Sequence, residues 1–363
     1  MSPTVPFNAL KPGDDAADIK AAIDRVVASG WFVLGPEVEA FEREFAAASQ
    51  VTHAVGVGTG TDAITLILRA LDIGPGDEVI TPPLSAAYSA LAVMMAGARP
   101  VFADIDPERL TLDPNATAAA ITSRTRALLP VHLYGQAADM RPFEALAARH
   151  NLALVEDAAQ AQLATYEGRA IGTIGIAAAT SFYPTKNLGA LGDGGAVLTR
   201  DTQLAARIKR LRNGGQTSRY HHEEAGANSR LDEMQAAILR ARLPHLPGWT
   251  AKRRAIAARY RTALAGARLH VPREFDAGHV YHLFPVLAEQ RDAFQAHMNA
   301  RGIETLIHYP VPIPRQPALK STSPAMCPVA DRVCAQVVSL PMYPGLSDEA
   351  AMAVGDAAAA FRP

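Results

Sequence analysis

Hydrophobic and polar residues follow two different periods along the first two-thirds of the chain. Short apolar runs rich in β-branched residues predict strands, and stretches with apolar residues three or four positions apart predict helices between several of them. The predicted strands are His53–Gly58, Glu78–Thr81, Pro100–Asp104, Ala127–Leu133, Leu152–Glu156, Ala178–Phe182 and Ala196–Thr199. The predicted helices among them include Asp62–Leu71, Tyr88–Ala96 and Arg141–His150. This alternation indicates an α/β fold with a mostly parallel sheet.

The pattern becomes mainly helical after Thr199. A helix is predicted over Gln203–Arg212, followed by an Asn-Gly-Gly stop signal. Ser229 and Asp232 have the spacing of a capping box, which predicts that the next helix opens there. A long helix from about residue 249 to residue 265 comes next, and short strands and helices with several prolines complete the chain.

This change in pattern predicts two domains, a larger one over residues 1–245 and a smaller C-terminal one over residues 246–363. A chain of 363 residues is long enough for both. The expected boundary lies near Pro244–Pro247.

Composition narrows the function classes. A net charge of −1 gives no general attraction to nucleic acid or to anionic lipid, so neither is an expected partner. No signal peptide or membrane-spanning stretch is visible. Cys327 and Cys334 are too few for a disulfide framework, so both are expected as small buried hydrophobic residues in a cytoplasmic protein.

Asp157 follows the apolar run at residues 152–155 and is expected at the carboxyl end of a buried strand. Ligands of parallel α/β sheets bind at this edge. A buried carboxylate needs a partner, which either loop amides or a ligand would supply.

Lys186 lies shortly after another predicted strand and is followed by glycines at positions 189, 192, 194 and 195. Glycines permit close approach of the backbone to a ligand. A lysine held against such a loop can be desolvated, which lowers its pKa and makes it a Schiff-base nucleophile. The alternative is a solvated lysine beside a structural turn.

The segment Gly56–Asp62 (GVGTGTD) lies between a predicted strand and a predicted helix. Backbone N–H groups at a helix N-terminus bind phosphate, although the segment matches neither a Walker motif nor the dinucleotide fingerprint. A phosphate cradle, a strand-end acid and a loop lysine are together what a pyridoxal-phosphate (PLP) site needs.

Several segments carry a wider similarity: Gly35–Val38 with Phe41-Glu42, Gly60–Ala63, Glu156–Gln160, Ser181–Lys186, Asn228–Ala236, His308–Pro310 and Ser339–Met342. In this order, and over essentially the whole chain, they resemble the DegT/DnrJ/EryC1/StrS sugar aminotransferases. The resemblance implies a PLP enzyme of the aspartate aminotransferase fold (fold type I). Such a fold has a large domain with a mostly parallel seven-stranded sheet and a smaller C-terminal α+β domain.

The resemblance also implies roles for individual residues. Lys186 would bind the cofactor aldehyde and move the proton between the sugar and the cofactor, and Asp157 would pair with the pyridine nitrogen. Gln160 would contact the region of the ring hydroxyl. The implied phosphate contacts are Ser181 and the amides of Gly60, Thr61 and Asp62. Asn228 resembles an asparagine that reaches the phosphate of the neighbouring subunit, which implies a homodimer with shared active sites.

Two departures from the family pattern affect the expected surroundings of the ring. The residue that usually stacks on the pyridine is aromatic, whereas Ala86 stands there and Tyr88 follows two positions later. Either Tyr88 moves in, or an aliphatic face replaces the stack. The family also often has histidine two residues after Gln160, where this chain has Gln162. Lys186 itself is present, which disfavours the family's dehydratase branch.

The resemblance implies two half-reactions, in which L-glutamate donates an amino group and a nucleotide-linked keto sugar accepts it. Residues 132–136 and 182–189 look more like the branch that aminates C3 of dTDP-3-keto-6-deoxyhexoses than the C4 branch. Candidate substrate contacts are Tyr183, His308, Tyr309 and Arg219, with Arg212 and Arg230 as further basic candidates for the anionic nucleotide. Packing in a loop is the alternative for His308 and Tyr309, and a surface or structural role is the alternative for the arginines.

Other readings are a 4-keto or hexuluronate nucleotide-sugar aminotransferase and a non-catalytic sensor or scaffold with the PLP fold. Lys186, Asp157 and Gln160 argue against the sensor, because a protein without turnover needs neither an electron sink nor a proton shuttle. A Rossmann dehydrogenase lacks its glycine fingerprint here. The run His221–Glu224 fits no zinc-ligand spacing, so no metal is expected.

Overall fold

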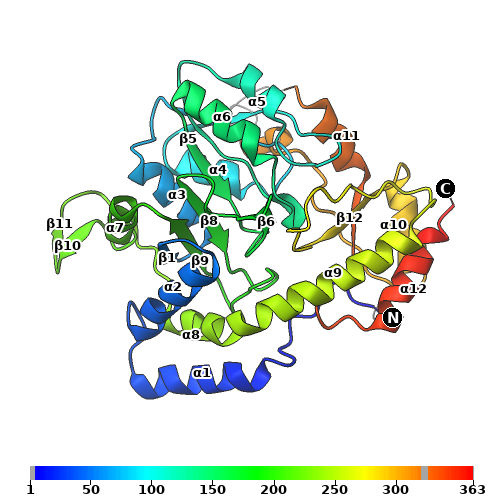
Figure 1. Ribbon diagram of the computed structural model, residues 1–363, viewed down its shortest axis with the longest axis horizontal. Helices are drawn as coiled ribbons and strands as arrows, with labels where there is room; N and C mark the ends of the chain where they lie inside the picture. Colours follow the sequence, from blue (N-terminus) through cyan, green and yellow to red (C-terminus); the bar gives the residue numbers. More distant parts are fainter. Residues whose placement is uncertain (1–4, 320–325, 363) are drawn as a thin grey trace.

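The computed structural model describes residues 5–319 and 326–362. A seven-stranded sheet lies at the centre of the larger part of the molecule (Figure 1). Its strands are β1 (His53–Val57), β2 (Glu78–Thr81), β3 (Arg99–Phe102), β4 (Thr125–Leu128), β5 (Ala153–Asp157), β8 (Ala177–Ser181) and β9 (Gly195–Thr199). Their spatial order is β1-β9-β8-β5-β4-β2-β3. β9 is antiparallel to both neighbours, and the other pairs are parallel, which confirms the predicted α/β class.

The strands bury both faces, and successive residues alternate between two hydrophobic clusters. Val55 and Val155 pack with the helices on one face, while Ala54 and Leu154 pack with those on the other. The first face carries α3 (Gly60–Ala70), α4 (Tyr88–Met95) and α7 (Thr202–Leu211). The second carries α2 (Pro36–Ala48), α6 (Met140–His150) and α8 (Glu233–Arg242). Burial on both faces explains why these strands read as continuous apolar runs.

The predicted strand Ala127–Leu133 is too long, because β4 ends at Leu128. Pro130 follows and has no N–H for a sheet hydrogen bond. The chain then forms the short 3₁₀ helix η1 (Leu133–Gly135).

The predicted capping box is wrong. α8 begins at Glu233 with Asp232 as its N-cap residue, and no side chain caps it. The Ser229 hydroxyl instead accepts from the Gly58 amide at 2.9 Å and donates to the Asp62 carboxylate at 2.7 Å. The Ser229 side chain is therefore engaged in a long-range contact and does not cap the helix that follows it.

A second hydrophobic core lies in the C-terminal part, around Tyr260, Phe284 and Phe294. Its antiparallel strands are β12 (Phe284–Leu287) and β13 (Val337–Leu340), and its helices include α10 (Arg291–Asn299) and α12 (Asp348–Ala359). The long helix α9 (Leu246–Ala263) runs from the sheet to this core (Figure 1). Trp249 in α9 packs with the first core and Ile256 with the second, so one helix joins them.

Several short elements complete the described chain. They are α1 (Ala16–Ser29), α5 (Pro114–Ala120), α11 (Pro328–Gln336), the 3₁₀ helices η2 (Leu243–His245), η3 (Ile313–Arg315) and η4 (Pro317–Leu319), and the hairpins β6 (Thr165–Tyr166) with β7 (Arg169–Ala170) and β10 (Gln216–Ser218) with β11 (His221–His222). The β10–β11 hairpin projects from the body of the molecule (Figure 1). The strands of both hairpins are too short to give a periodic signal in the sequence.

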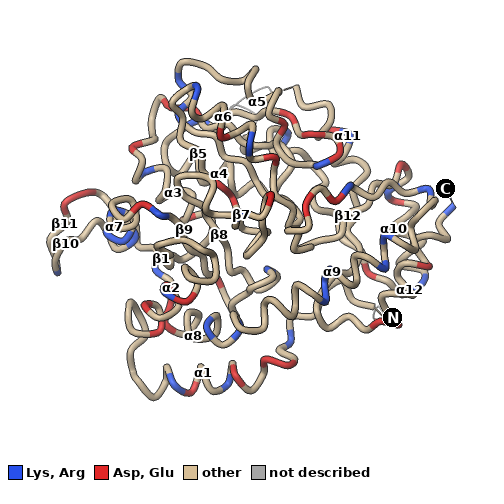
Figure 2. The backbone as a smooth tube through the Cα atoms, in the orientation of Figure 1, with Lys and Arg blue, Asp and Glu red and all other residues tan. Residues whose placement is uncertain are grey.

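Acidic and basic residues are interspersed along the chain rather than gathered in single-sign blocks (Figure 2). Among the described helices, none is long and apolar enough to cross a membrane. Cys327 and Cys334 are buried and free, as predicted. Burial raises the pKa of both thiols to about 12.

Candidate active site

A cavity of about 620 Å³ opens where β5 and β8 end, at the edge where the sheet was expected to bind a ligand. Many residues singled out from the sequence line it: Gly60, Thr61, Tyr88, Asp157, Gln160, Ser181, Tyr183, Lys186, His308 and Tyr309. They come from positions 60 to 309, so only the fold brings them together.

Asp157 is the last residue of β5 and is buried. Its Oδ2 accepts a hydrogen bond of 2.7 Å from the Ser89 hydroxyl, and its Oδ1 accepts one of 3.1 Å from the Ala159 amide. Both partners donate, so together they hold the carboxylate in one orientation. The bond to a loop amide is one of the two partners expected for this residue, and Asp157 also lines the cavity, where a ligand could reach it.

Lys186 lies in the loop between β8 and β9. Burial lowers the pKa of its amine to about 8, and the negative charge of Asp157 acts in the opposite direction. The loop is tight: a Cβ on Gly189 would lie 2.5 Å from the Pro184 carbonyl oxygen, so only glycine fits there. Lys186 is partly buried, which favours the lysine of lowered pKa over a fully solvated one.

The phosphate cradle is expected at the start of α3, which lines the cavity. Thr59 is the N-cap, and its hydroxyl accepts from the Asp62 amide at 3.0 Å, so that amide already has an acceptor. The amides of Gly60 and Thr61 belong to the first turn, which has no intrahelical acceptors. A Cβ on Gly60 would lie 2.8 Å from the Cβ of Ser181, so glycine lets the helix start approach the end of β8. The arrangement fits a phosphate group.

A hydrogen-bonded network fixes the wall of the cavity around Gln160. Its Oε1 accepts from the Tyr134 amide at 2.7 Å, and its Nε2 donates to the Tyr309 hydroxyl oxygen at 3.0 Å. The Tyr134 hydroxyl donates to the His308 carbonyl. Burial, with a contribution from Lys186, lowers the pKa of His308 to about 4, so this imidazole is neutral at neutral pH.

Ala86 and Tyr88 both line the cavity. Tyr88 is the first residue of α4 and is 64% exposed, so its ring is not packed into the protein interior. Ala86, at the position where the resemblance implies an aromatic ring, offers only a methyl group to the cavity.

Three predicted residues are not among those that line the cavity. The carboxylate of Asp62 accepts from Ser229, as described above. Asn228 forms an isolated bridge with Asn213, and Arg219 lies on the projecting β10–β11 hairpin with its guanidinium 5.0 Å from the Tyr220 ring centre.

The two further arginine candidates are also elsewhere. Arg212 is buried, bonds the Glu42 carboxylate and donates to the Gly56 carbonyl at 2.6 Å, which is a structural role. Arg230 donates to the Asn213 side chain at 3.0 Å.

Sequence reasoning missed Ser85, Ser89, Asp193 and His282, which also line the cavity. Burial, with Lys186 and Arg253, lowers the pKa of His282 well below its ordinary value. Ser89 lies on the buried face of an apolar helix, and a hydroxyl in that position was the one local signal available. No local pattern marks His282, which comes from the C-terminal part of the chain.

Within the part of the chain that the structure describes, no group of three or more histidine, cysteine, aspartate or glutamate side chains is arranged to hold a metal ion. His221 and His222 are exposed on the hairpin, and the His222 ring is bonded to the Gly214 carbonyl at 2.7 Å.

Comparison with known proteins agrees with this geometry. The model of the DegT/DnrJ/EryC1/StrS aminotransferase family matches residues 14–359. The chain is 51% identical to the dTDP-3-amino-3,4,6-trideoxy-alpha-D-glucose transaminase of Streptomyces venezuelae, over 98% of this chain and 96% of the relative. It is 49% identical to the erythromycin biosynthesis sensory transduction protein EryC1 of Saccharopolyspora erythraea, with 92% and 93% covered.

Among solved structures, that of S. venezuelae DesV in complex with a ketimine intermediate superposes with a TM-score of 0.96. It is 51% identical, and the match covers 98% of both chains. The predicted cofactor is confirmed, because the family depends on PLP. The cavity fits that cofactor, since it offers an amine of lowered pKa, a buried carboxylate and a helix N-terminus for the phosphate. The chain therefore belongs to the DegT/DnrJ/EryC1/StrS family of PLP-dependent aminotransferases.

Proposed function

We propose that the protein transfers an amino group from L-glutamate to C3 of a nucleotide-linked keto sugar, a dTDP-3-keto-6-deoxyhexose. The observation that carries the proposal is the meeting of Lys186 and Asp157 in one cavity with a phosphate cradle. The S. venezuelae relative is named for a 3-amino dTDP-sugar, which supports C3 as the carbon that receives the amine and dTDP as the nucleotide.

The side chains of the cavity have distinct tasks in this proposal. Bound PLP supplies an electron-withdrawing ring that lets the substrate carbon lose and regain a proton. Asp157 holds a proton on the pyridine nitrogen, and the hydrogen bonds from Ser89 and Ala159 keep this carboxylate oriented. Lys186 accepts and returns the proton of the substrate carbon, for which an amine of pKa about 8 suits neutral conditions. Ser181 and the amides of Gly60 and Thr61 hold the cofactor phosphate.

The proposal includes a homodimer whose subunits complete each other's sites. Asn228 and Arg219 are not among the lining residues of the cavity of their own chain, so a second copy would have to supply them. Large apolar side chains are exposed at Trp31, Phe32 and on the projecting hairpin at Tyr220. Such surfaces are typical of subunit interfaces.

The proposal is tested with purified protein loaded with PLP. The visible absorbance of the lysine-bound cofactor should convert to the pyridoxamine form on addition of L-glutamate, and a dTDP-3-keto-6-deoxyhexose should restore it. Lys186→Ala should abolish both changes. Asp157→Asn should slow them by about 100-fold or more, the scale of the larger electrostatic effects in enzymes. A panel with 4-keto sugars and a nucleotide-linked hexuluronate separates the substrates, and restoration only by one of these would refute the C3 assignment.

A second candidate is a regulatory role without turnover, because the EryC1 relative is named a sensory transduction protein. Intact Lys186 and Asp157 in one cavity argue against it. Cofactor absorbance that no amino donor changes would favour the regulatory role over the enzyme.

A further inference from the structure

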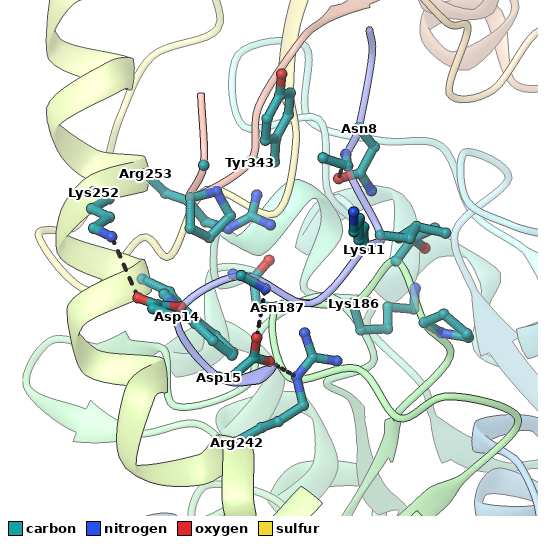
Figure 3. Close-up of a pocket in the computed structure, with 18 residues that line it drawn as sticks. Asn8, Lys11, Asp14, Asp15, Lys186, Asn187, Arg242, Lys252, Arg253 and Tyr343 are labelled. Atoms are coloured by element: carbon teal, nitrogen blue, oxygen red, sulfur yellow. Dashed lines mark hydrogen bonds and ion pairs between the residues drawn. The ribbon is translucent and has the colours of Figure 1, made fainter. Parts of the chain in front are cut away.

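A second cavity, of about 270 Å³, lies against the loop that carries Lys186 (Figure 3). Its walls come from residues 8–15 near the N-terminus, from residues 184–187 of the lysine loop, from the end of α8, from α9 and from residues 343–345. It is smaller than the 300–1,000 Å³ that are typical of pockets for drug-sized ligands, so its occupant must be small. The residues proposed to bind the cofactor line the 620 Å³ cavity, and of these only Lys186 also lines this second cavity.

The charges in this cavity are unequal. Lys11, Lys186, Arg242, Lys252 and Arg253 line it, against the acids at positions 14 and 15. Figure 3 shows that both acids have basic neighbours of their own.

Asp15 lies 2.8 Å from Arg242, and Asp14 lies 3.7 Å from Lys252. These two pairs leave Lys11, Lys186 and Arg253 without an ion-pair partner among the described residues, and Lys186 is the residue that would bind the cofactor. Lys11 is exposed at the mouth, whereas Arg253 is only 4% exposed.

Arg253 is the unusual member of the set. Its Nη1 donates to three backbone carbonyls, of Tyr281, His282 and Met342, at 2.9 to 3.2 Å. Its Nε is buried and has no hydrogen-bond partner in the described structure. Burial without an opposite charge lowers the pKa of this guanidinium to about 10. A buried cation without an opposite charge is costly unless an anion comes close to it.

We propose that this cavity is a binding site for a small oxyanion, a phosphate or a carboxylate group, held by Arg253 from within and by Lys11 at the mouth. Guanidinium and ammonium donors together match the oxygens of such groups. The site is distinct from the cofactor cradle, which uses backbone amides at the start of α3. Its location behind the lysine loop means that an occupant would lie next to the segment that positions Lys186.

Calorimetry on the PLP-loaded protein at low ionic strength tests the proposal, with the cofactor cradle already filled. Inorganic phosphate and glutarate, a dicarboxylate that cannot accept an amino group, are titrated separately. Saturable binding of phosphate alone would identify a phosphate site, and binding of glutarate would identify a carboxylate site. Absence of saturable binding for both would overturn the proposal. No sugar or turnover is involved, so failure of the proposed aminotransferase reaction would leave this result unaffected.

Variants at the exposed mouth locate the binding without disturbing the buried arginine. Lys11→Gln should weaken binding about tenfold, the effect of losing one charge-assisted hydrogen bond, and Lys11→Arg should restore it. Lys20→Gln is the matched control, because Lys20 is an exposed lysine on α1 that pairs with Asp24. Equal loss in the Lys20 control, or no loss in Lys11→Gln, would contradict the assignment. Crystals soaked in arsenate should show anomalous density beside Arg253, and density confined to other places would also refute it.

Discussion

At the scale of single residues, the chemistry depends on how two opposite charges are supported in one cavity. The amine of Lys186 is made more acidic by burial, whereas the carboxylate of Asp157 is supported by two hydrogen-bond donors. The acid was recognisable from the sequence because it ends an apolar strand. Its partner Ser89 was not, because the two residues are 68 positions apart.

Ser89→Ala should slow the glutamate half-reaction about tenfold, because loss of one hydrogen bond to a charged group costs on the order of 1.5 kcal/mol. Stopped-flow absorbance of the cofactor measures this rate, and Ser89→Thr should recover it. Ser85→Ala is the control, since Ser85 lines the same cavity, whereas the carboxylate of Asp157 is bonded by Ser89 and Ala159. An unchanged rate and cofactor spectrum in Ser89→Ala would show that the serine does not position the acid.

The lowered pKa of Lys186 gives a pH dependence with a definite sign. Only the neutral amine attacks the aldehyde of PLP, so capture of PLP by the apoprotein should speed up as pH rises. With the pKa of the amine at about 8, the rate should level off above that pH. An ordinary lysine would continue to gain neutral amine up to about pH 10.4. The measurement is the absorbance change on mixing apoprotein with PLP across this range, and a rate still climbing above pH 9 would contradict the expected value.

At the scale of elements, α2 is an example of a helix capped from a distance. Its N-cap residue Gly35 has no side chain to offer. The carboxylate of Glu233, the first residue of α8, accepts from the amides of Gly35, Glu37 and Val38 at 2.8 to 2.9 Å. Glu233 is almost fully buried, so these amides have no water to replace it. The negative charge also complements the helix dipole.

Glu233→Ala should therefore lower the free energy of unfolding by about 3 kcal/mol, because it leaves buried amides without an acceptor. Chemical denaturation of the apoprotein measures the change. Glu39→Ala removes an exposed acid from the same first turn and should have an effect within about 0.5 kcal/mol. Equal effects of the two substitutions would mean that α2 does not depend on this contact.

The same elements show what the sequence could predict. Every strand of the main sheet was predicted, because burial on both faces leaves an apolar run bounded by turns. The start of α8 was misplaced, because the choice between Ser229 and Asp232 depends on Gly58 and Asp62, about 170 positions away. Contacts between residues so far apart in the sequence cannot be recognised from the few residues around the start of a helix.

At the scale of the whole molecule, the cavity is assembled from both parts of the chain. Asp157 and Ser181 lie at strand ends, where a parallel sheet places ligands, so their place at the cavity was predictable. His282 comes from beyond α9, and only the packing of the second core against the first brings it beside Lys186. Asn228 and Arg219 were also predicted from the sequence, but neither is among the residues that line the cavity of their own chain.

The proposed sharing of sites between two subunits predicts that two inactive variants can complement each other. Lys186→Ala and Asn228→Ala should each be inactive, yet their mixture should regain roughly a quarter of wild-type activity. Random exchange makes half of the dimers mixed, and each mixed dimer has one intact site. Activity is assayed after the subunits have been allowed to exchange, and mixing each variant with itself is the control. No recovery despite proven exchange would mean that Asn228 acts within its own chain.

The two native thiols have a practical consequence. Cys327 and Cys334 are buried, and their pKa of about 12 leaves almost no thiolate at neutral pH. Thiol-directed dyes react with the thiolate, so the folded protein should behave toward them as if it contained no cysteine. A single cysteine introduced at the exposed Tyr220 position would then carry a fluorophore by itself. The fluorophore would report movement of the projecting hairpin and its burial by a second subunit. The native cysteines would not have to be replaced first.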